Sequence, residues 1–144
     1  MDDQAIRDIE KHKKKSLNRY QKNLACIRRL EEKLGILDER ITTVKSPSLS
    51  GMPRGGIPVT IADLISDKVE LEKRIERLKA KGQDLKAAVY EEIDSIEEPR
   101  YCEILEAHYI NGKTFETIAE DMGYTERYIY MLYAEAITLL VEKE

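Results

Sequence analysis

Few side chains in this sequence are suited to covalent or metal chemistry. The 144 residues include two cysteines, Cys26 and Cys102, and two histidines, His12 and His108, and these four are not spaced as metal ligands. Aspartates and glutamates are spread along predicted helices, and no nucleophile, general base and orienting group occur together. We therefore expect a protein that is not an enzyme, with no cofactor, no metal and no small-molecule substrate, and with reduced cysteines.

A stretch near the C-terminus instead has the spacing of two short packed helices suited to recognition. Thr114 and Thr125 are good N-cap residues, and Gly123 between them suits a turn with positive φ. Aliphatic residues that would pack the helices together occupy Ile118, Met122, Ile129 and Leu132, with the small Ala119 where the helices cross. This pattern is typical of a helix-turn-helix, whose second helix enters the DNA major groove.

The segment from Glu103 to Leu140 resembles region 4 of the sigma-70 family. Both have the order threonine cap, Ile-Ala, glycine turn, threonine cap and aliphatic positions. The whole chain, including residues 46–60, is similar to small proteins from phages and prophages of Gram-positive bacteria, of the kind of the ArpU and RinA late-operon regulators. The resemblance implies a role in transcription, with double-stranded DNA as the partner and RNA polymerase as a further candidate partner.

Carried over position by position, the resemblance also implies a DNA-binding face. It places Glu126, Arg127, Tyr130 and Met131 on the groove-facing side of the second helix, and Thr125 near the DNA backbone. Arginine can bond guanine through two hydrogen bonds, glutamate can accept one from cytosine, and tyrosine can touch a phosphate or a thymine methyl group. The helix departs from the sigma pattern because it holds a single arginine among tyrosines.

Two other groups of side chains have alternative interpretations. Lys11, Lys14 and Lys15 could contact DNA phosphates or the acidic C-terminal segment, whereas a solvated helix face is the simpler interpretation. The aromatic positions expected to pack in a core or an interface are Tyr124, Tyr128 and Tyr133, and His108 is expected to be a packed core or boundary residue.

Two heptad seams predict the elements that precede this region. One runs from Ile6 to Val44 without a proline and predicts a single long helix, and the second runs from Ile61 to Ile96. The connection, residues 46–59, holds three of the four prolines and Arg54, which could contact an anion or simply be solvated. We expect an all-α protein: an antiparallel coiled-coil hairpin over residues 1–98 that mediates dimerisation, and a helix-turn-helix domain over residues 99–144.

An antiparallel register can be read from the two seams. If Val44 faces Ile61, facing residue numbers sum to 105, so Lys13 falls opposite Glu92 and Asn23 opposite Gly82. The same register places Leu37 opposite Lys68, a mismatch that a lysine stem can tolerate. Thr60 and Asp63 are placed to cap the second helix, which should end near residues 98–99 because the residue before a proline avoids helical geometry.

Charge is unevenly distributed along the chain. The net charge of -4 divides into +4 for residues 1–45, -3 for residues 46–98 and -5 for residues 99–144. The region expected to read DNA is therefore acidic, which leaves open an alternative function: a protein-binding adaptor that engages RNA polymerase or a host factor without sequence-specific DNA readout. No apolar run approaches the roughly 20 residues of a membrane span, so we expect a cytoplasmic protein with no membrane partner.

Overall fold

The computed structural model describes residues 2–45 and 60–143, and these residues form helices without any strand. The helices are α1 (Asp3–Leu17), α2 (Arg19–Lys45), α3 (Ile61–Asp94), α4 (Pro99–Tyr109), α5 (Phe115–Met122) and α6 (Glu126–Glu142). The all-α prediction is confirmed for this part of the chain. The predicted connection at residues 46–59, with Arg54, lies outside the described residues.

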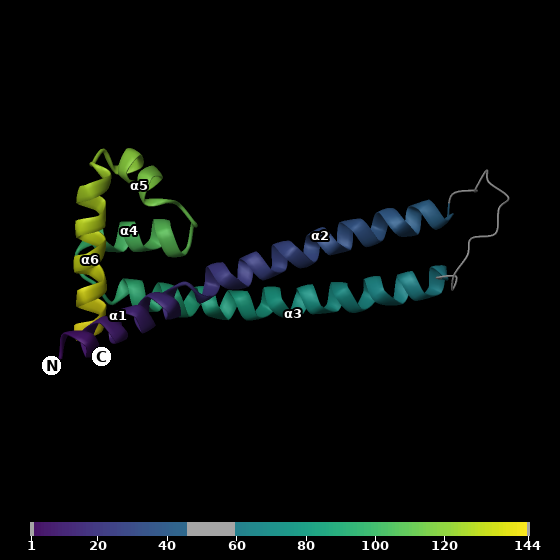
Figure 1. Cartoon of the computed structure of the whole chain (residues 1–144), viewed down its shortest axis with the longest axis horizontal. Coiled ribbons are helices and arrows are strands. Elements are labelled where there is room, and N and C mark those ends of the chain that lie inside the picture. Colours follow the sequence, from purple (N-terminus) through teal and green to yellow (C-terminus); the bar gives the residue numbers. More distant parts are fainter. Residues whose placement is uncertain (1, 46–59, 144) are drawn as a thin grey trace. The chain divides into compact units, whose positions relative to one another are not determined.

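Contacts group the chain into two units. The first, which we call the compact unit, comprises Met1–Asn23 and Gly82–Glu144, and the second, the helical pair, comprises Leu24–Lys81. In the compact unit α6 packs against α1, α4 and α5 (Figure 1). The contacts do not divide the chain between residues 98 and 99, where the domain boundary was predicted. Instead, α1 and the last turns of α3 group with α4–α6.

The prediction of one uninterrupted helix from Ile6 to Val44 is wrong. Helix α1 ends at Leu17, and α2 begins at Arg19. Asn18 lies between them with φ -79° and ψ -6°, and its backbone N–H still donates to the Lys14 carbonyl at 3.0 Å. Asparagine is a poor helix former because its short side chain competes for backbone hydrogen bonds, which explains the position of this interruption.

Within the helical pair, α2 and α3 run antiparallel. Asp38 pairs with Lys68 at 2.8 Å and Glu31 pairs with Lys79 at 3.5 Å, so a later residue of α2 meets an earlier residue of α3. Figure 1 shows these helices side by side. Their shared core contains seam residues that both predicted seams supply: Ile27, Leu30, Leu34, Leu71, Ile75 and Leu78.

The predicted register is also confirmed at two polar pairs in the compact unit. Lys13 Nζ lies 3.0 Å from Glu92 Oε1, and a Cβ atom built on Gly82 would lie 2.6 Å from Asn23 Oδ1. Both pairs have residue numbers that sum to 105. At the start of α3 the predicted cap is present, since Thr60 Oγ1 accepts a hydrogen bond from the Asp63 N–H at 3.1 Å.

The end of α3 differs from the prediction. The helix ends at Asp94 instead of near residues 98–99, and Ser95 Oγ donates to the Glu92 carbonyl at 2.7 Å. Pro99 occupies the first turn of α4, where its missing N–H costs nothing. Glu98 is the N-cap of α4, and the Arg100 side chain, which donates to its carboxylate at 2.9 Å, lowers the pKa of that carboxyl.

Candidate nucleic-acid interface

The turn between α5 and α6 has the local geometry that its sequence predicts. Thr114 Oγ1 accepts a hydrogen bond from the Thr117 N–H at 3.2 Å and caps α5, and Thr125 Oγ1 accepts one from the Tyr128 N–H at 3.2 Å and caps α6. Gly123 adopts φ 72° and ψ 30°, the left-handed conformation that glycine accommodates without strain. Two helix caps and one glycine therefore determine how α5 leads into α6.

A small apolar core holds the two helices together. Ile118 and Ala119 of α5 are buried against Ile129 and Leu132 of α6, and Ile104 of α4 closes the cluster. Ala119 has only a methyl side chain and so takes up little space in this core. Because its inward side chains are fixed in this core, α6 presents a defined outer face.

Four of the five predicted DNA-binding residues lie on the surface of the first two turns of α6, and the fifth, Thr125, is its N-cap. Glu126 and Arg127 are exposed, and Tyr130 and Met131 each keep 49% of their surface exposed. Among the described residues Arg127 has no ion pair. Thr125 is exposed too, but its hydroxyl is engaged in capping α6. The arrangement presents one guanidinium, one carboxylate and two large side chains to solvent on adjacent turns.

The tyrosines near this face differ in their burial. Tyr133 is half-buried, as predicted, and its hydroxyl shares a hydrogen bond with that of Tyr109. Tyr128 is also half-buried and accepts a hydrogen bond from Arg100 Nη1 at 2.9 Å, whereas Tyr124 is 38% exposed and meets Tyr128 edge to face. The ring of Tyr130 leans on Phe115, with centroids 4.6 Å apart.

His108 confirms its predicted role as a packed boundary residue. Its ring stacks on Phe115 with centroids 4.4 Å apart and an interplanar angle of 22°. Its Nδ1 atom lies 2.9 Å from the carbonyl oxygen of Lys113. The side chain therefore tightens the connection between α4 and α5.

The lysines of α1 belong to the same compact unit. Lys11, Lys14 and Lys15 are exposed, whereas Lys13 is buried and paired with Glu92. Lys14 Nζ lies 5.6 Å from the ring centroid of Tyr133 on α6, a cation–π contact. The basic run thus contacts the acidic C-terminal segment through one member and offers the other two to solvent.

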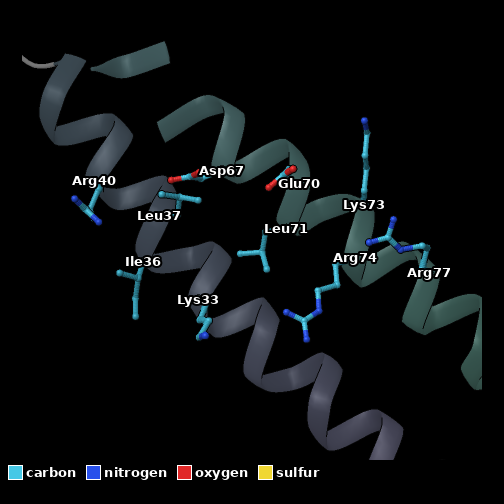
Figure 2. A pocket seen from close by; sticks show the side chains of 10 residues that line it. All are labelled: Lys33, Ile36, Leu37, Arg40, Asp67, Glu70, Leu71, Lys73, Arg74 and Arg77. Atoms are coloured by element: carbon cyan, nitrogen blue, oxygen red, sulfur yellow. The ribbon is translucent and has the colours of Figure 1, made fainter. Parts of the chain in front are cut away.

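The sequence interpretation missed two features that fix or extend this surface. Gln21 of α2 donates through Nε2 to the carbonyls of Tyr109 and Ile110, at 3.2 and 2.8 Å, and so ties α2 to the end of α4. The second is a groove of about 540 Å³ between the two helices of the helical pair, lined by several arginines and lysines (Figure 2). Basic residues at heptad spacing, such as Lys33 and Arg40, were the available sequence signal.

Two other features were sought in the part of the chain that the structure describes. No three histidine, cysteine, aspartate or glutamate side chains there are grouped as metal ligands. No described helix has both the length and the apolar character needed to cross a membrane.

No family model, no curated protein and no solved structure matches this chain. The resemblance to sigma region 4 and to phage regulators therefore stays a prediction from the sequence.

Proposed function

We propose that this chain is a phage-type transcriptional regulator in which α5 and α6 form a sigma region 4-like helix-turn-helix that binds promoter DNA. The observation that carries the proposal is the sequence of local structures from Thr114 to Leu132. A capped short helix, a left-handed glycine and a second capped helix come in this order, and the first turns of the second helix are exposed. In a helix-turn-helix these exposed turns contact base edges.

The side chains on α6 suggest how sequence would be read. Arg127 supplies the paired donors that match the O6 and N7 atoms of guanine, and Glu126 supplies an acceptor for the amino group of cytosine. The ring of Tyr130 packs on Phe115, which would hold the tyrosine in position while its hydroxyl contacts a phosphate. Thr125 would lie near the DNA backbone; its hydroxyl oxygen accepts the capping hydrogen bond of α6, and its hydroxyl proton can still be donated to a phosphate.

Phosphate contacts would come from α1. The segment from residue 99 onward carries a net charge of -5, so α6 gains little general attraction to DNA. Helix α1 packs against α6 and exposes Lys11 and Lys15, with Lys14 seated over Tyr133. Cations on α1 would thus compensate for the scarcity of cations on α6.

The coiled-coil hairpin would mediate dimerisation. The helical pair exposes four large aliphatic side chains. Ile36 lies in the groove, and the other three are Val44, Ile65 and Val69, at 43%, 40% and 44% of their surfaces. A dimer would set two recognition helices on half-sites one DNA turn, about 34–36 Å, or a multiple apart. Sedimentation equilibrium tests this part: Ile65→Lys/Val69→Lys should shift the chain toward monomer, and an unshifted mass would contradict it.

DNA binding is tested by selection from a pool of duplexes with a randomised central segment, followed by titration of the selected duplex. Arg127→Ala should weaken binding to the selected duplex by about 1–3 kcal/mol and should relax the sequence preference at one base pair. Arg28→Ala is the matched control, because it removes the same charge from an exposed position in the helical pair. If no duplex is enriched, or if both variants weaken binding equally, α6 is not a sequence reader.

A second function is favoured by one specific observation, the acidity of the same surface. Glu116, Glu120 and Asp121 on α5 and Glu126 of α6 are all exposed, and of these Asp121 pairs with Lys113 at 2.8 Å. Such a surface suits a protein-binding adaptor that engages RNA polymerase or a host factor without reading DNA. Binding to purified polymerase that Glu126→Lys abolishes, in the absence of any selected duplex, would favour the adaptor.

A further inference from the structure

The groove in the helical pair gathers several cations. Lys33 and Arg40 of α2 line it together with Lys73, Arg74 and Arg77 of α3. Within the described residues none of these five makes an ion pair. In Figure 2 Arg74 points from α3 toward α2, on the side where Lys33 projects, and Lys73 points away from α2. Cations from both helices therefore line the groove.

The two edges of the seam carry different charge patterns. Glu31 and Asp38 follow the seam residues Leu30 and Leu37 by one position, and both form ion pairs with α3, to Lys79 and Lys68. Lys33 and Arg40 precede the seam residues Leu34 and Ile41 by one position, which places them on the opposite edge. There Lys33 shares the groove with Arg74, a pair of like charges that an anion would relieve.

The floor of the groove is apolar. Leu37 and Leu71 lie between the two helices in Figure 2, and both are half-buried. Ile36 keeps 60% of its surface exposed, the largest fraction among the exposed large apolar side chains described. Cations on both sides of an aliphatic floor match an amphipathic helix, which would bury an apolar stripe and pair its flanking carboxylates.

The two carboxylates of the groove make its two ends different in charge. Asp67 and Glu70 line the end where Arg40 lies, whereas Lys33, Arg74 and Arg77 line the other end. Phosphates of a nucleic-acid backbone would be repelled at the first end and would gain nothing from the aliphatic floor. A second copy of the same groove would bring together two faces that each carry more cations than carboxylates, so self-association through this face is disfavoured.

We infer that this groove is a docking site for an acidic amphipathic helix of a partner protein. The partner helix carries an aliphatic stripe over Leu37 and Leu71, carboxylates on both sides of the stripe near Lys33, Arg74 and Arg77, and a basic residue near Asp67 and Glu70. Lys33 and Arg40 are seven residues apart, about 10 Å along α2, so a partner helix of three to four turns covers the groove. The site goes beyond the proposed DNA binding and uses none of the residues of α6.

The test is a selection with displayed peptides of about 14 residues. Leucines are fixed at the spacing of one helix face, the other positions are random, and the bait is the full-length chain. Enriched peptides should carry aspartate or glutamate beside the leucines, grouped toward one end. The best peptide, labelled with fluorescein, should bind Lys33→Gln/Arg74→Gln roughly tenfold more weakly than wild type, as expected when two exposed charge pairs are lost.

Controls separate this result from misfolding and from DNA binding. Lys22→Gln/Arg28→Gln removes two charges from exposed positions outside the groove and should leave peptide affinity unchanged. The groove variant should keep the helical circular dichroism of wild type. Arg127→Ala should not alter peptide affinity, so failure of the DNA proposal leaves this one standing.

Three results would overturn the inference. The first is the absence of enriched peptides, or enrichment without acidic residues. The second is equal binding of the selected peptide to wild type and to Lys33→Gln/Arg74→Gln. The third is that the groove variant binds a short DNA duplex more weakly than wild type does but binds the peptide equally well. That result would make the groove a phosphate site.

Discussion

At the scale of single residues, the α5–α6 turn depends on Gly123. The residue adopts φ 72°, and a Cβ atom added there would meet nothing within 4 Å, so only the backbone conformation requires glycine. The two threonine caps and this glycine could all be predicted, because each acts on residues within three or four positions along the chain. The contact of Lys14 with Tyr133 could not, since it depends on how α1 packs against α6.

A matched pair of substitutions tests the role of Gly123. Gly123→Ala should lower the free energy of unfolding by about 1 kcal/mol, because an alanine is strained in the left-handed region. Gly35→Ala should raise it by about 0.5–1 kcal/mol, because Gly35 lies inside α2 with open space around its Cα. Urea unfolding followed by circular dichroism measures both, and effects of the same sign would contradict the assignment.

At the scale of elements, the pairing of helices could be read largely from the sequence. Apolar residues at heptad spacing gave the register of α2 and α3, and Lys13–Glu92 and Asn23–Gly82 follow it. The break at Asn18 was not foreseen, because the seam continues through it and only the weak helix propensity of asparagine marks it. The groove was not foreseen either, because ion pairing on one edge of the seam and not on the other depends on side-chain placement.

The Asn23–Gly82 pair offers a test of the contact between α2 and α3. Asn23 Oδ1 is buried without a hydrogen-bond partner among the described residues, and it lies 2.6 Å from where a Cβ on Gly82 would be. Gly82→Ala should therefore destabilise the chain by about 1 kcal/mol, since the clash outweighs the gain in helix propensity. In an Asn23→Ala background the same change should stabilise it, and additive effects in the double-mutant cycle would refute the contact.

The packing of α4 against α6 should appear in alkaline unfolding. Burial raises the pKa of Tyr109 and of Tyr133 above the ordinary value of 10.0. As the pH rises above 10, the unfolded chain loses these phenolic protons while the folded chain keeps them. The contribution of these tyrosines to the free energy of unfolding is therefore fully present below pH 10 and is lost as the pH rises above it. Each such tyrosine contributes a slope of about 1.4 kcal/mol per pH unit there. Tyr109→Phe should make the fall in unfolding free energy shallower, and an unchanged slope would contradict the burial.

At the scale of the whole molecule, the distribution of charge bears on both proposals. Residues 99–144 are acidic with a net charge of -5, while residues 1–45 carry +4, and cations reappear on α3 in the groove. The compact unit holds α1 and α6 together, so a DNA-binding face would combine cations of one helix with base-reading groups of another. The sequence shows this segregation of charge, but which cations adjoin α6 follows from the fold.

The salt dependence of DNA affinity measures how many of these cations contact phosphates. For a duplex, log Kobs falls with log[salt] by about 0.9 for each phosphate contact. Lys11→Gln/Lys15→Gln should therefore reduce the slope by roughly 2 if both side chains contact phosphates, and should weaken all sequences alike. Arg28→Gln, which removes an exposed charge of α2 outside the predicted contacts, is the control and should leave the slope unchanged. If the slope stays the same in the double variant, Lys11 and Lys15 of α1 do not contact phosphates. Any DNA contact would then come from α6 and its single arginine.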